Sequence, residues 1–334
     1  MFDILTIGTA TRDVFLTSPA FKVLRDKEHL VKLGFKTGEA ECFALGSKIR
    51  IEEPFLTSGG GAYNTAVTFS RQELKTGALV KVGDDAAGKT VIRNLKEEKI
   101  TPLALTDRKS GTGYSTILVT PGGERTILVY RGASYEMKKK ELPWKRMKAQ
   151  WVYVSPGEIP FSTMSEIVSR MKKQGSRIAI NPSKYYLSLK KGTLEPFLNK
   201  CDVVIVNREE ASHLTGKPYE KDKAIFKKFD EIVEGIAVVT DGPRGAAVSD
   251  GSFIYRSGVF KEKKRADRTG AGDAFASGFI SGLLRKNDVH YALRLATANA
   301  TSVVEHVGAT TGSLTKRAFS SKRWKYLNLD VEPL

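Results

Sequence analysis

The chain has 334 residues, of which 41% are hydrophobic, and its formal net charge is +17 at pH 7. This length and apolar content suffice for one large α/β domain or two ordinary ones, and no apolar run reaches the roughly 18 residues that a membrane-spanning helix needs. The first residues, MFDILTIG, lack the basic region of a secretory signal peptide. Two cysteines in so long a chain indicate a reducing compartment, so we expect a cytoplasmic protein without structural disulfides.

Basic charge is spread widely along the chain, with short runs such as KKK at 138–140 and KEKKR at 261–265. A solvated basic surface explains most of it, and attraction of anionic ligands such as nucleotides or sugar phosphates is the main alternative. Nucleic acid is an unlikely partner on this reading, because no basic stripe with interleaved aromatic residues and no nucleic-acid-binding motif is present. The KEKKR run stands apart because it precedes a glycine-rich segment.

Short apolar runs alternate with segments that have helical spacing of apolar residues. Near-continuous valine and isoleucine content is typical of parallel strands that are covered on both faces. The alternation predicts an α/β fold with an open, mostly parallel sheet and helices on both faces. The predicted strands are 4–8, 77–83, 151–155, 177–182, 203–207, 235–242 and 252–260, and the predicted helices are 62–74, 87–99, 162–175, 208–216, 274–285 and 289–306, the last capped by Asn287 or Asp288.

Two segments depart from this alternation. Residues 12–57 contain strand-like runs around a helix-like patch, and residues 112–131 contain two strand-like runs around PGGE, which predicts a hairpin. Both segments are antiparallel in character, and together they predict a small β lid over one end of the main sheet. No linker or internal repeat divides the chain. We therefore expect a single domain over 1–334 whose lid comes from about 12–57 and 112–131.

The first two polar motifs follow predicted strands near the N-terminus. Asp13 ends ILTIGTATRD, and ligands of open α/β sheets bind beyond the carboxyl ends of the strands, so Asp13 is a candidate acceptor for substrate hydroxyl groups. SGGGAYNTA (58–66) has three glycines before a helix, which lets the backbone at Gly60 approach a ligand, and Asn64 follows in the first turn. A tight turn with a solvated Asn64 is the plain alternative. The G-x-G-x-x-G spacing is missing, which argues against a dinucleotide-dependent dehydrogenase.

Two further motifs end predicted strands in the second half of the chain. VNREE places Asn207 at a strand end and Glu210 three residues later. Glu210 is either a helix-capping group or a carboxylate that holds a hydrated magnesium ion. In VVTDGPRGAA, Gly242 and Gly245 form a turn after a strand, which suits backbone contact with a nucleotide.

ADRTGAGDAF (266–275) lies between a predicted strand and a predicted apolar helix. The helix would begin near Gly270, Ala271 and Gly272, whose small side chains leave the free amides at its positive end open to an anion. A carboxylate beside such amides, here Asp273, suits a reaction that removes a proton and creates negative charge, such as phosphoryl transfer to a hydroxyl group. The plain alternative is tight packing at a helix start, with an acidic residue that favours the helix dipole.

In this order, the motifs resemble those of the ribokinase-like (PfkB-type) carbohydrate kinases, a family that includes nucleoside kinases. The resemblance covers nearly the whole chain, and DRTGAGD is close to the family's DTGAGD signature. It implies a transferase that uses ATP and Mg²⁺ to phosphorylate a hydroxyl group of a ribose- or fructose-like sugar. An adenosine-like nucleoside or a sugar phosphate is the alternative acceptor. A non-catalytic regulatory or nucleic-acid-binding protein on this scaffold is the alternative of another class, against which the intact DRTGAGD argues.

The resemblance also implies roles for individual residues. Asp273 matches the catalytic base, and Gly270, Ala271 and Gly272 match the anion hole. The positions that match substrate-binding residues are Asp13, Gly60 and Asn64. The positions that match nucleotide-binding residues are Asn207, Glu210, Thr240, Gly242, Gly245 and Asn299, with Glu210 holding Mg²⁺ through water.

The chain departs from the family pattern in the loop before the base. Arg268 stands where the family usually has a small residue such as threonine. Many relatives bind a monovalent cation near this loop, and VGATTGSL (307–314) resembles the second segment of that site with one residue out of step. Asp267 and Ser313 are therefore the candidate contacts for K⁺.

The predicted lid also departs from the family, because residues 18–57 form a longer segment than the family has there. Three basic residues, Arg12, Arg125 and Arg131, lie near the predicted lid. They are either surface charges or groups that bind a phosphate or carboxylate of the acceptor. Besides a small-molecule substrate, a second copy of the chain is the expected partner, through the lid.

Overall fold

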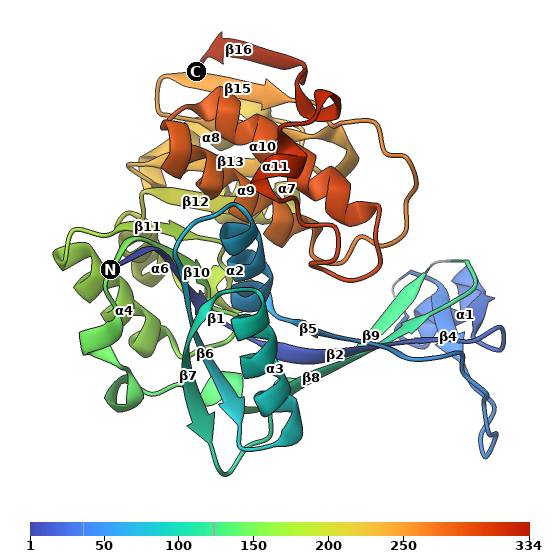
Figure 1. Ribbon diagram of the computed structural model, residues 1–334. Coiled ribbons are helices and arrows are strands. Elements are labelled where there is room, and N and C mark those ends of the chain that lie inside the picture. Colours follow the sequence, from blue (N-terminus) through green and yellow to red (C-terminus); the bar gives the residue numbers. More distant parts are fainter. Residues whose placement is uncertain (36, 123) are drawn as a thin grey trace.

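A computed structural model describes residues 1–35, 37–122 and 124–334 of the chain. Within these ranges its main sheet has ten strands, in the order β16-β15-β14-β13-β12-β11-β10-β1-β6-β7 (Figure 1). Strands from β13 to β7 pair in parallel, and β14, β15 and β16 pair antiparallel. The strands are β1 (Phe2–Gly8), β6 (Thr76–Gly83), β7 (Thr101–Asp107), β10 (Ala149–Ser155), β11 (Arg177–Ile180), β12 (Val203–Asn207), β13 (Ile236–Thr240), β14 (Ala246–Ser249), β15 (Phe253–Ser257) and β16 (Leu329–Pro333).

Helices cover both faces of this sheet. Because side chains alternate along each strand, every strand contributes residues to the core on either face. In β10, Val152 and Val154 join the core that contains Met164 of α4, whereas Trp151 and Tyr153 join the core beneath α9 and α10. The predicted open, mostly parallel α/β fold is confirmed. The helices are α1 (Lys27–Lys32), α2 (Gly61–Arg71), α3 (Ala86–Glu97), α4 (Phe161–Lys173), α5 (Lys184–Leu187), α6 (Lys191–Leu198), α7 (Arg208–Thr215), α8 (Asp222–Ile232), α9 (Ala271–Lys286), α10 (Val289–Val304) and α11 (Lys316–Phe319).

A four-stranded small sheet, in the order β5-β2-β8-β9 within the described residues, projects from the main body (Figure 1). It consists of β2 (Thr11–Thr17), β5 (Phe55–Gly59), β8 (Gly113–Val119) and β9 (Arg125–Tyr130). The hairpin of β8 and β9 is confirmed, although Gly123 of its predicted turn lies outside the described residues. The predicted antiparallel character holds within each segment, where β2 pairs with β5 and β8 with β9, but the two segments join in parallel through β2 and β8. Both strands follow parallel strands of the main sheet and leave it in the same direction.

The register of the small sheet gathers polar side chains on one of its faces. Asp13 on β2 lies opposite Thr57 of β5 and Ser115 of β8. Because side chains alternate, the same face continues with the aromatic pair of Phe15 and Phe55, whose ring centroids are 5.8 Å apart. This face therefore changes from polar near the main sheet to apolar farther out.

The far end of the small sheet carries an extension. There β3 (Lys22–Arg25) and β4 (Glu39–Cys42) form a second, two-stranded sheet beside α1. Across the described ranges, the helices are all too short or too polar to cross a membrane. Cys42 and Cys201 are free thiols.

Candidate active site

Helix α9 begins at Ala271, within the segment where we predicted its start. Its N-cap, Gly270, has a φ of 76°, a left-handed conformation that glycine adopts readily, and a Cβ there would lie 2.5 Å from Cβ of Ala309. The first turn of a helix has amides without partners inside the helix. Buried apolar residues, including the stacked rings of Phe275 and Phe279, fix the helix on the sheet and so fix the direction of these amides.

Gly272 has no packing reason to be glycine. A Cβ added to it would meet no heavy atom within 4 Å, and its backbone is ordinary helix. The open space is part of a cavity of ≈ 290 Å³ that Ala271 and Gly272 line together. The missing side chain leaves the first amides of α9 uncovered, as an anion site requires.

Asp273 lies at the junction of α9, α2 and β10. The Asn64 amide donates a hydrogen bond of 2.8 Å to Oδ2 of Asp273. A Cβ on Gly61 would overlap Oγ of Ser155 and lie 3.6 Å from Oδ1 of Asp273. Burial raises the pKa of Asp273 to about 6, and the hydrogen bond from Asn64 acts in the opposite direction. Tyr153 is fully buried, and its pKa is raised by burial and by the charge of Asp273.

Asp13 lies on the other side of the glycine segment. Thr11 donates a hydrogen bond of 2.8 Å to Oδ1 of Asp13, and burial raises the pKa of Asp13. A Cβ on Gly59 would overlap Oδ2 of Asp13, and Gly60 has a φ of 91° with backbone of Thr9 packed against it. The segment 59–61 therefore contacts Asp13 at one end and Asp273 at the other. The structure brings together four residues that the sequence predicted separately, namely Asp13, Gly60, Asn64 and Asp273.

The cavity beside Gly272 is lined by the turn after β13. Thr240, Gly242 and Gly245, the residues predicted to contact a nucleotide, all line this cavity. Gly245 has a φ of 95°, and a Cβ there would overlap the carbonyl oxygen of Ser257. The remaining lining residues combine apolar surface with two arginines and one glutamate. They are Pro243, Val259, Glu262, Arg265, Arg268, Phe275, Thr297, Ala300, Thr301 and Val304.

The lining residues from α10 were missed by sequence reasoning. The residues of α10 that line the cavity recur at helical spacing and are Thr297, Ala300, Thr301 and Val304. Small and hydroxyl side chains on one face of an otherwise apolar helix could have indicated a ligand-facing surface in the sequence. We had predicted Asn299 instead. Asn299 is fully buried away from the cavity, where it donates to the carbonyl oxygen of Ala274 (2.8 Å) and accepts from the amide of Leu314 (2.7 Å).

Asn207 and Glu210 form a reciprocal capping box at the start of α7. Oδ1 of Asn207 accepts from the Glu210 amide, and Oε2 of Glu210 accepts from the Asn207 amide, both at 2.9 Å. Asn207 pairs in register with Thr240, so the motif lies next to the turn after β13. Burial raises the pKa of Glu210. Since Oε1 makes no hydrogen bond among the described residues, Glu210 can still receive a water ligand of a magnesium ion, and both of its predicted roles are compatible.

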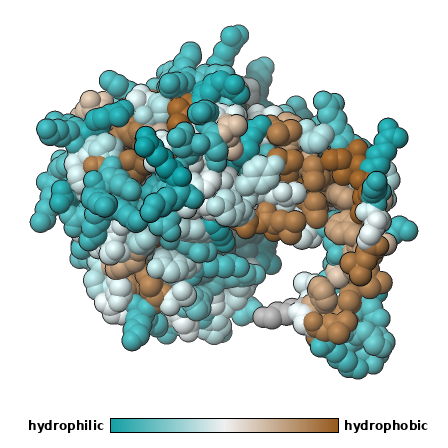
Figure 2. Space-filling view, turned by 90° about the horizontal axis from the view of Figure 1, so that it is seen from below, coloured by the Kyte–Doolittle hydropathy of each residue, from teal (hydrophilic) through white to brown (hydrophobic). Residues whose placement is uncertain are grey.

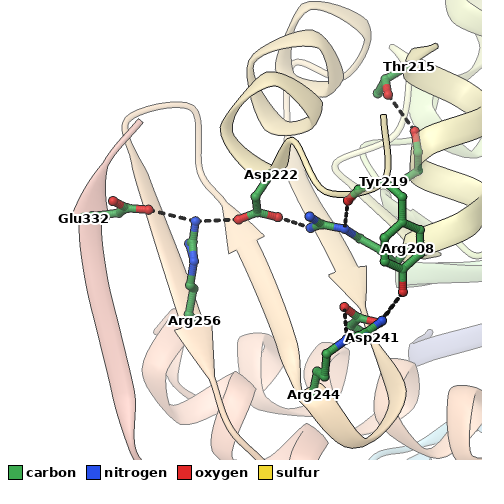
Figure 3. A network of polar contacts seen from close by, with 9 residues as sticks. Arg208, Thr215, Tyr219, Asp222, Asp241, Arg244, Arg256 and Glu332 are labelled. Carbon is green, nitrogen blue, oxygen red and sulfur yellow. Dashed lines mark hydrogen bonds and ion pairs between the residues drawn. The ribbon is translucent and has the colours of Figure 1, made fainter. Parts of the chain in front are cut away.

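A polar network holds the turn after β13 (Figure 3). Arg208 pairs with Asp222 and donates to the carbonyl oxygen of Tyr219 at 2.8 Å. The hydroxyl group of Tyr219 in turn donates to Asp241, inside the turn, at 2.8 Å. Asp222 also pairs with Arg256 of β15. The network thus connects the start of α7 to the turn after β13 and to the antiparallel edge of the sheet.

Asp267 already has a cationic neighbour. Nη1 of Arg125, on β9, lies 2.8 Å from its Oδ1, and the amide of Gly308 donates to its Oδ2. Ser313 accepts instead from the hydroxyl group of Thr68 at 3.3 Å. Within the described ranges, no group of three or more His, Cys, Asp or Glu residues is arranged to hold a metal ion. Asp267 and Ser313 therefore stay the predicted contacts for K⁺.

Comparison with known proteins agrees with this geometry. The model of the pfkB family carbohydrate kinases matches residues 27–317. The chain is 26% identical over 262 residues to an ATP-dependent 6-phosphofructokinase of Thermoanaerobacterium thermosaccharolyticum, covering 75% of this chain and 80% of that protein. It is 26% identical to a ribokinase of Lactococcus lactis (86% and 92% covered) and to a cytidine kinase of Thermococcus kodakarensis (75% and 88%). Equal identity to three kinases with different names does not select an acceptor.

Solved structures share the fold. The structure of Arabidopsis thaliana ribokinase complexed with ribose and ATP superposes with a TM-score of 0.80 at 20% identity, covering 97% of this chain and 99% of that chain. The nucleoside kinase of Methanocaldococcus jannaschii superposes with a TM-score of 0.77 at 20% identity, covering 97% and 98%. Both the large sheet and the small sheet are therefore features of the ribokinase fold.

The open space at Gly272 yields a prediction. Gly272→Ala should leave the free energy of unfolding unchanged or raise it by up to about 1 kcal/mol, because alanine favours the helix. The added methyl group should weaken ATP binding by about tenfold or more, since a hydrogen bond to a charged group contributes about 1.5–3 kcal/mol. Calorimetric titration with ATP and thermal unfolding measure the two effects.

Gly192→Ala is the matched control. Gly192 is also the second residue of a helix, α6, and a Cβ there also meets nothing within 4 Å. This control should retain ATP affinity. Unchanged ATP binding in Gly272→Ala would mean that the space at Gly272 is not an anion site.

Proposed function

The chain belongs to the pfkB family of carbohydrate kinases, and we propose that Asp273 and the first amides of α9 carry out its phosphoryl transfer from ATP to a hydroxyl group. The observation that carries this proposal is the position of Asp273. Its carboxylate accepts from Asn64 at 2.8 Å and adjoins amides that Gly272 leaves uncovered in a cavity. A base and an anion site thus lie side by side, which is what attack of a hydroxyl group on a phosphoryl group requires.

In this mechanism, Asp273 takes the proton of the attacking hydroxyl group. The hydroxyl oxygen forms a bond to the γ-phosphorus, and the bond from that phosphorus to the bridging oxygen breaks to release ADP. The amides of Gly270, Ala271 and Gly272 would stabilise negative charge on the transferred group, for which the Ala271 amide has to exchange its 3.3 Å hydrogen bond to the carbonyl oxygen of Arg268. Asn64 holds the carboxylate in place and lowers its pKa, which keeps it ionised near neutral pH.

Thr240, Gly242 and Gly245 would contact the nucleotide, together with the apolar wall of the same cavity. We assign Mg²⁺ to Glu210 through a water molecule, with Asn207 keeping the Glu210 side chain in place through their capping box. When bound, the ion would neutralise charge on the phosphates.

We propose that Asp13 binds hydroxyl groups of the acceptor, with Thr57 and Ser115 opposite it on the small sheet. The small sheet, from about 12–57 and 112–131, would then act as the lid of a single domain over 1–334 and exclude water from the reaction. A ribose- or fructose-like sugar is the acceptor class that we test first, followed by nucleosides and sugar phosphates.

Two free thiols fit a protein of the reducing cytoplasm.

The first prediction concerns Asp273→Asn. With ATP, Mg²⁺ and a panel of ribose, fructose, fructose 6-phosphate, adenosine and cytidine, the wild type should release ADP with at least one acceptor. Asp273→Asn should abolish this release while it retains ATP binding. Its stability at pH 8 should not fall, because a carboxyl group whose pKa is raised to about 6 destabilises the fold when ionised. Full activity of the variant would overturn the assignment of the base. The panel is run with and without K⁺, because Asp267 and Ser313 are the predicted contacts for this ion.

The second prediction is the pH dependence of kcat/KM. A base with a pKa of about 6 is protonated below that pH, so kcat/KM should fall about tenfold per pH unit on the acidic side. The hydrogen bond from Asn64 lowers this pKa, so Asn64→Ala should move the acidic limb to higher pH. The measurement is kcat/KM from pH 5 to pH 8. An acidic limb that stays in place in Asn64→Ala would contradict the pairing of Asn64 with Asp273 during turnover.

We also propose that a second copy of the chain binds along β9. This strand is an edge of the small sheet, and Figure 2 shows hydrophobic side chains gathered on the projecting small sheet. Leu128 and Tyr130 are more than half exposed, at 56% and 54%. Such an edge is available for pairing with another strand.

The third prediction tests this pairing. Light scattering should give a particle of twice 36.8 kDa for the wild type and a monomer for Leu128→Lys. Leu128 and Asp13 lie on opposite faces of the small sheet, so this variant leaves the acceptor face unchanged. Tyr326→Lys, which alters an apolar residue that is 90% exposed elsewhere, should remain a dimer. A monomeric wild type would refute the proposal.

A further inference from the structure

Arg268 lies at the boundary between two cavities. One is the cavity of ≈ 290 Å³ that Ala271 and Gly272 line. The other has a volume of ≈ 590 Å³ and lies against the small sheet, where Phe15, Phe55 and Arg125 line it. On the proposed function, the first receives the nucleotide and the second adjoins the acceptor. Neither lining includes Asp13 or Asp273, so a group that lines both can reach a phosphate group held at the end of the nucleotide cavity that faces the small sheet.

The backbone around Arg268 is held on both sides. The amides of Ala266 and Asp267 donate to the carbonyl oxygen of Val304, at 2.9 and 3.2 Å, and the carbonyl oxygen of Arg268 accepts from Ala271 at 3.3 Å. The side chain, in contrast, is exposed and makes no hydrogen bond or ion pair with any residue that the structure describes. Its guanidinium group is thus carried by an ordered loop and is free to bind a ligand.

The other cationic side chains that line the two cavities, Arg125 and Arg265, are already paired. Arg265 also lines both cavities, but its Nε lies 3.0 Å from Oε2 of Glu262. Arg125 pairs with Asp267 at 2.8 Å. Among the described residues, Arg268 is therefore the cation lining these cavities that has no ion-pair partner. A guanidinium group presents a planar fork of donors that matches phosphate oxygens, and it stabilises charge on a phosphoryl group in transfer.

We propose that Arg268 binds the oxygens of the γ-phosphoryl group and stabilises them during transfer, as a catalytic residue in addition to Asp273 and the amides of α9. This inference rests on the proposed function, because it assigns the two cavities to donor and acceptor. The proposed role gives a chemical reason for an arginine at position 268. The hydrogen bonds that hold this loop are made by the backbone, so a small side chain would preserve them equally well. The proposed role also predicts that Arg268 distinguishes ATP from ADP.

The test measures nucleotide affinity without an acceptor. Dissociation constants for ADP and for an ATP analogue with an imido group between its β- and γ-phosphates are measured by calorimetry with Mg²⁺. Arg268→Ala should weaken the binding of the analogue by about tenfold or more, the range of a charge-assisted hydrogen bond, and should leave ADP affinity within about twofold. Arg268→Lys should lose less, since it keeps the charge but not the fork. With the best acceptor, kcat of Arg268→Ala should fall by about 10³-fold.

Lys264→Ala is the matched control, because Lys264 is an exposed basic residue of the same loop and lines neither cavity. Its analogue affinity should stay within about twofold of the wild type. Equal losses in the two variants, or an equal loss of ADP and analogue affinity in Arg268→Ala, would overturn the inference. A wild type that binds neither nucleotide would refute the proposed function itself. A wild type that turns over an acceptor with an unaffected Arg268→Ala would refute only the role of Arg268.

Discussion

The hydrogen bond between Asn64 and Asp273 joins the N-termini of α2 and α9, and the proposed chemistry depends on it. Asp273 has to be buried enough to face an acceptor without competing water, yet ionised enough to take a proton. Burial raises its pKa to about 6, and the Asn64 amide acts against that rise. The hydrogen bond is formed only because the glycine segment lets α2 begin in contact with Ser155 and Asp273. Packing of the backbone thus sets the electrostatics of the base.

The charged groups around this centre are paired into a stable frame. The network of Arg208, Asp222 and Arg256 and the pair of Arg125 and Asp267 each place a cation against a carboxylate. The strong basic charge of the chain is therefore largely compensated near the cavities, and one unpaired guanidinium group there can matter. Total charge alone says little about such a site, because the distribution of pairs decides which charge a ligand meets.

Much of the fold could be predicted from the sequence. Buried parallel strands contain continuous apolar runs, which are visible in the local sequence without knowledge of the strand they pair with. The strands that were missed have weaker signals: β7 contains a proline, β14 is short and rich in alanine, and β16 is an exposed edge. The site residues with special backbone needs, such as Gly60 and Gly270, were predictable from local sequence. The contacts of Asn299 and the partner of Asp267 were not, because they come from residues far away in the chain.

The glycine segment 59–61 has a consequence for how acceptor preference can change. Side chains at these three positions would meet Asp13, the backbone of Thr9 and the Ser155 side chain, so this part of the acceptor site admits no substitution that adds atoms. Beyond Gly59 and Gly113, the strands of the small sheet contain no glycine, and on the proposed function they contribute the opposite wall. New acceptor preferences can thus arise by drift and selection on the small sheet while the catalytic side stays fixed. An unchanged kinase centre can in this way acquire a succession of substrates in evolution.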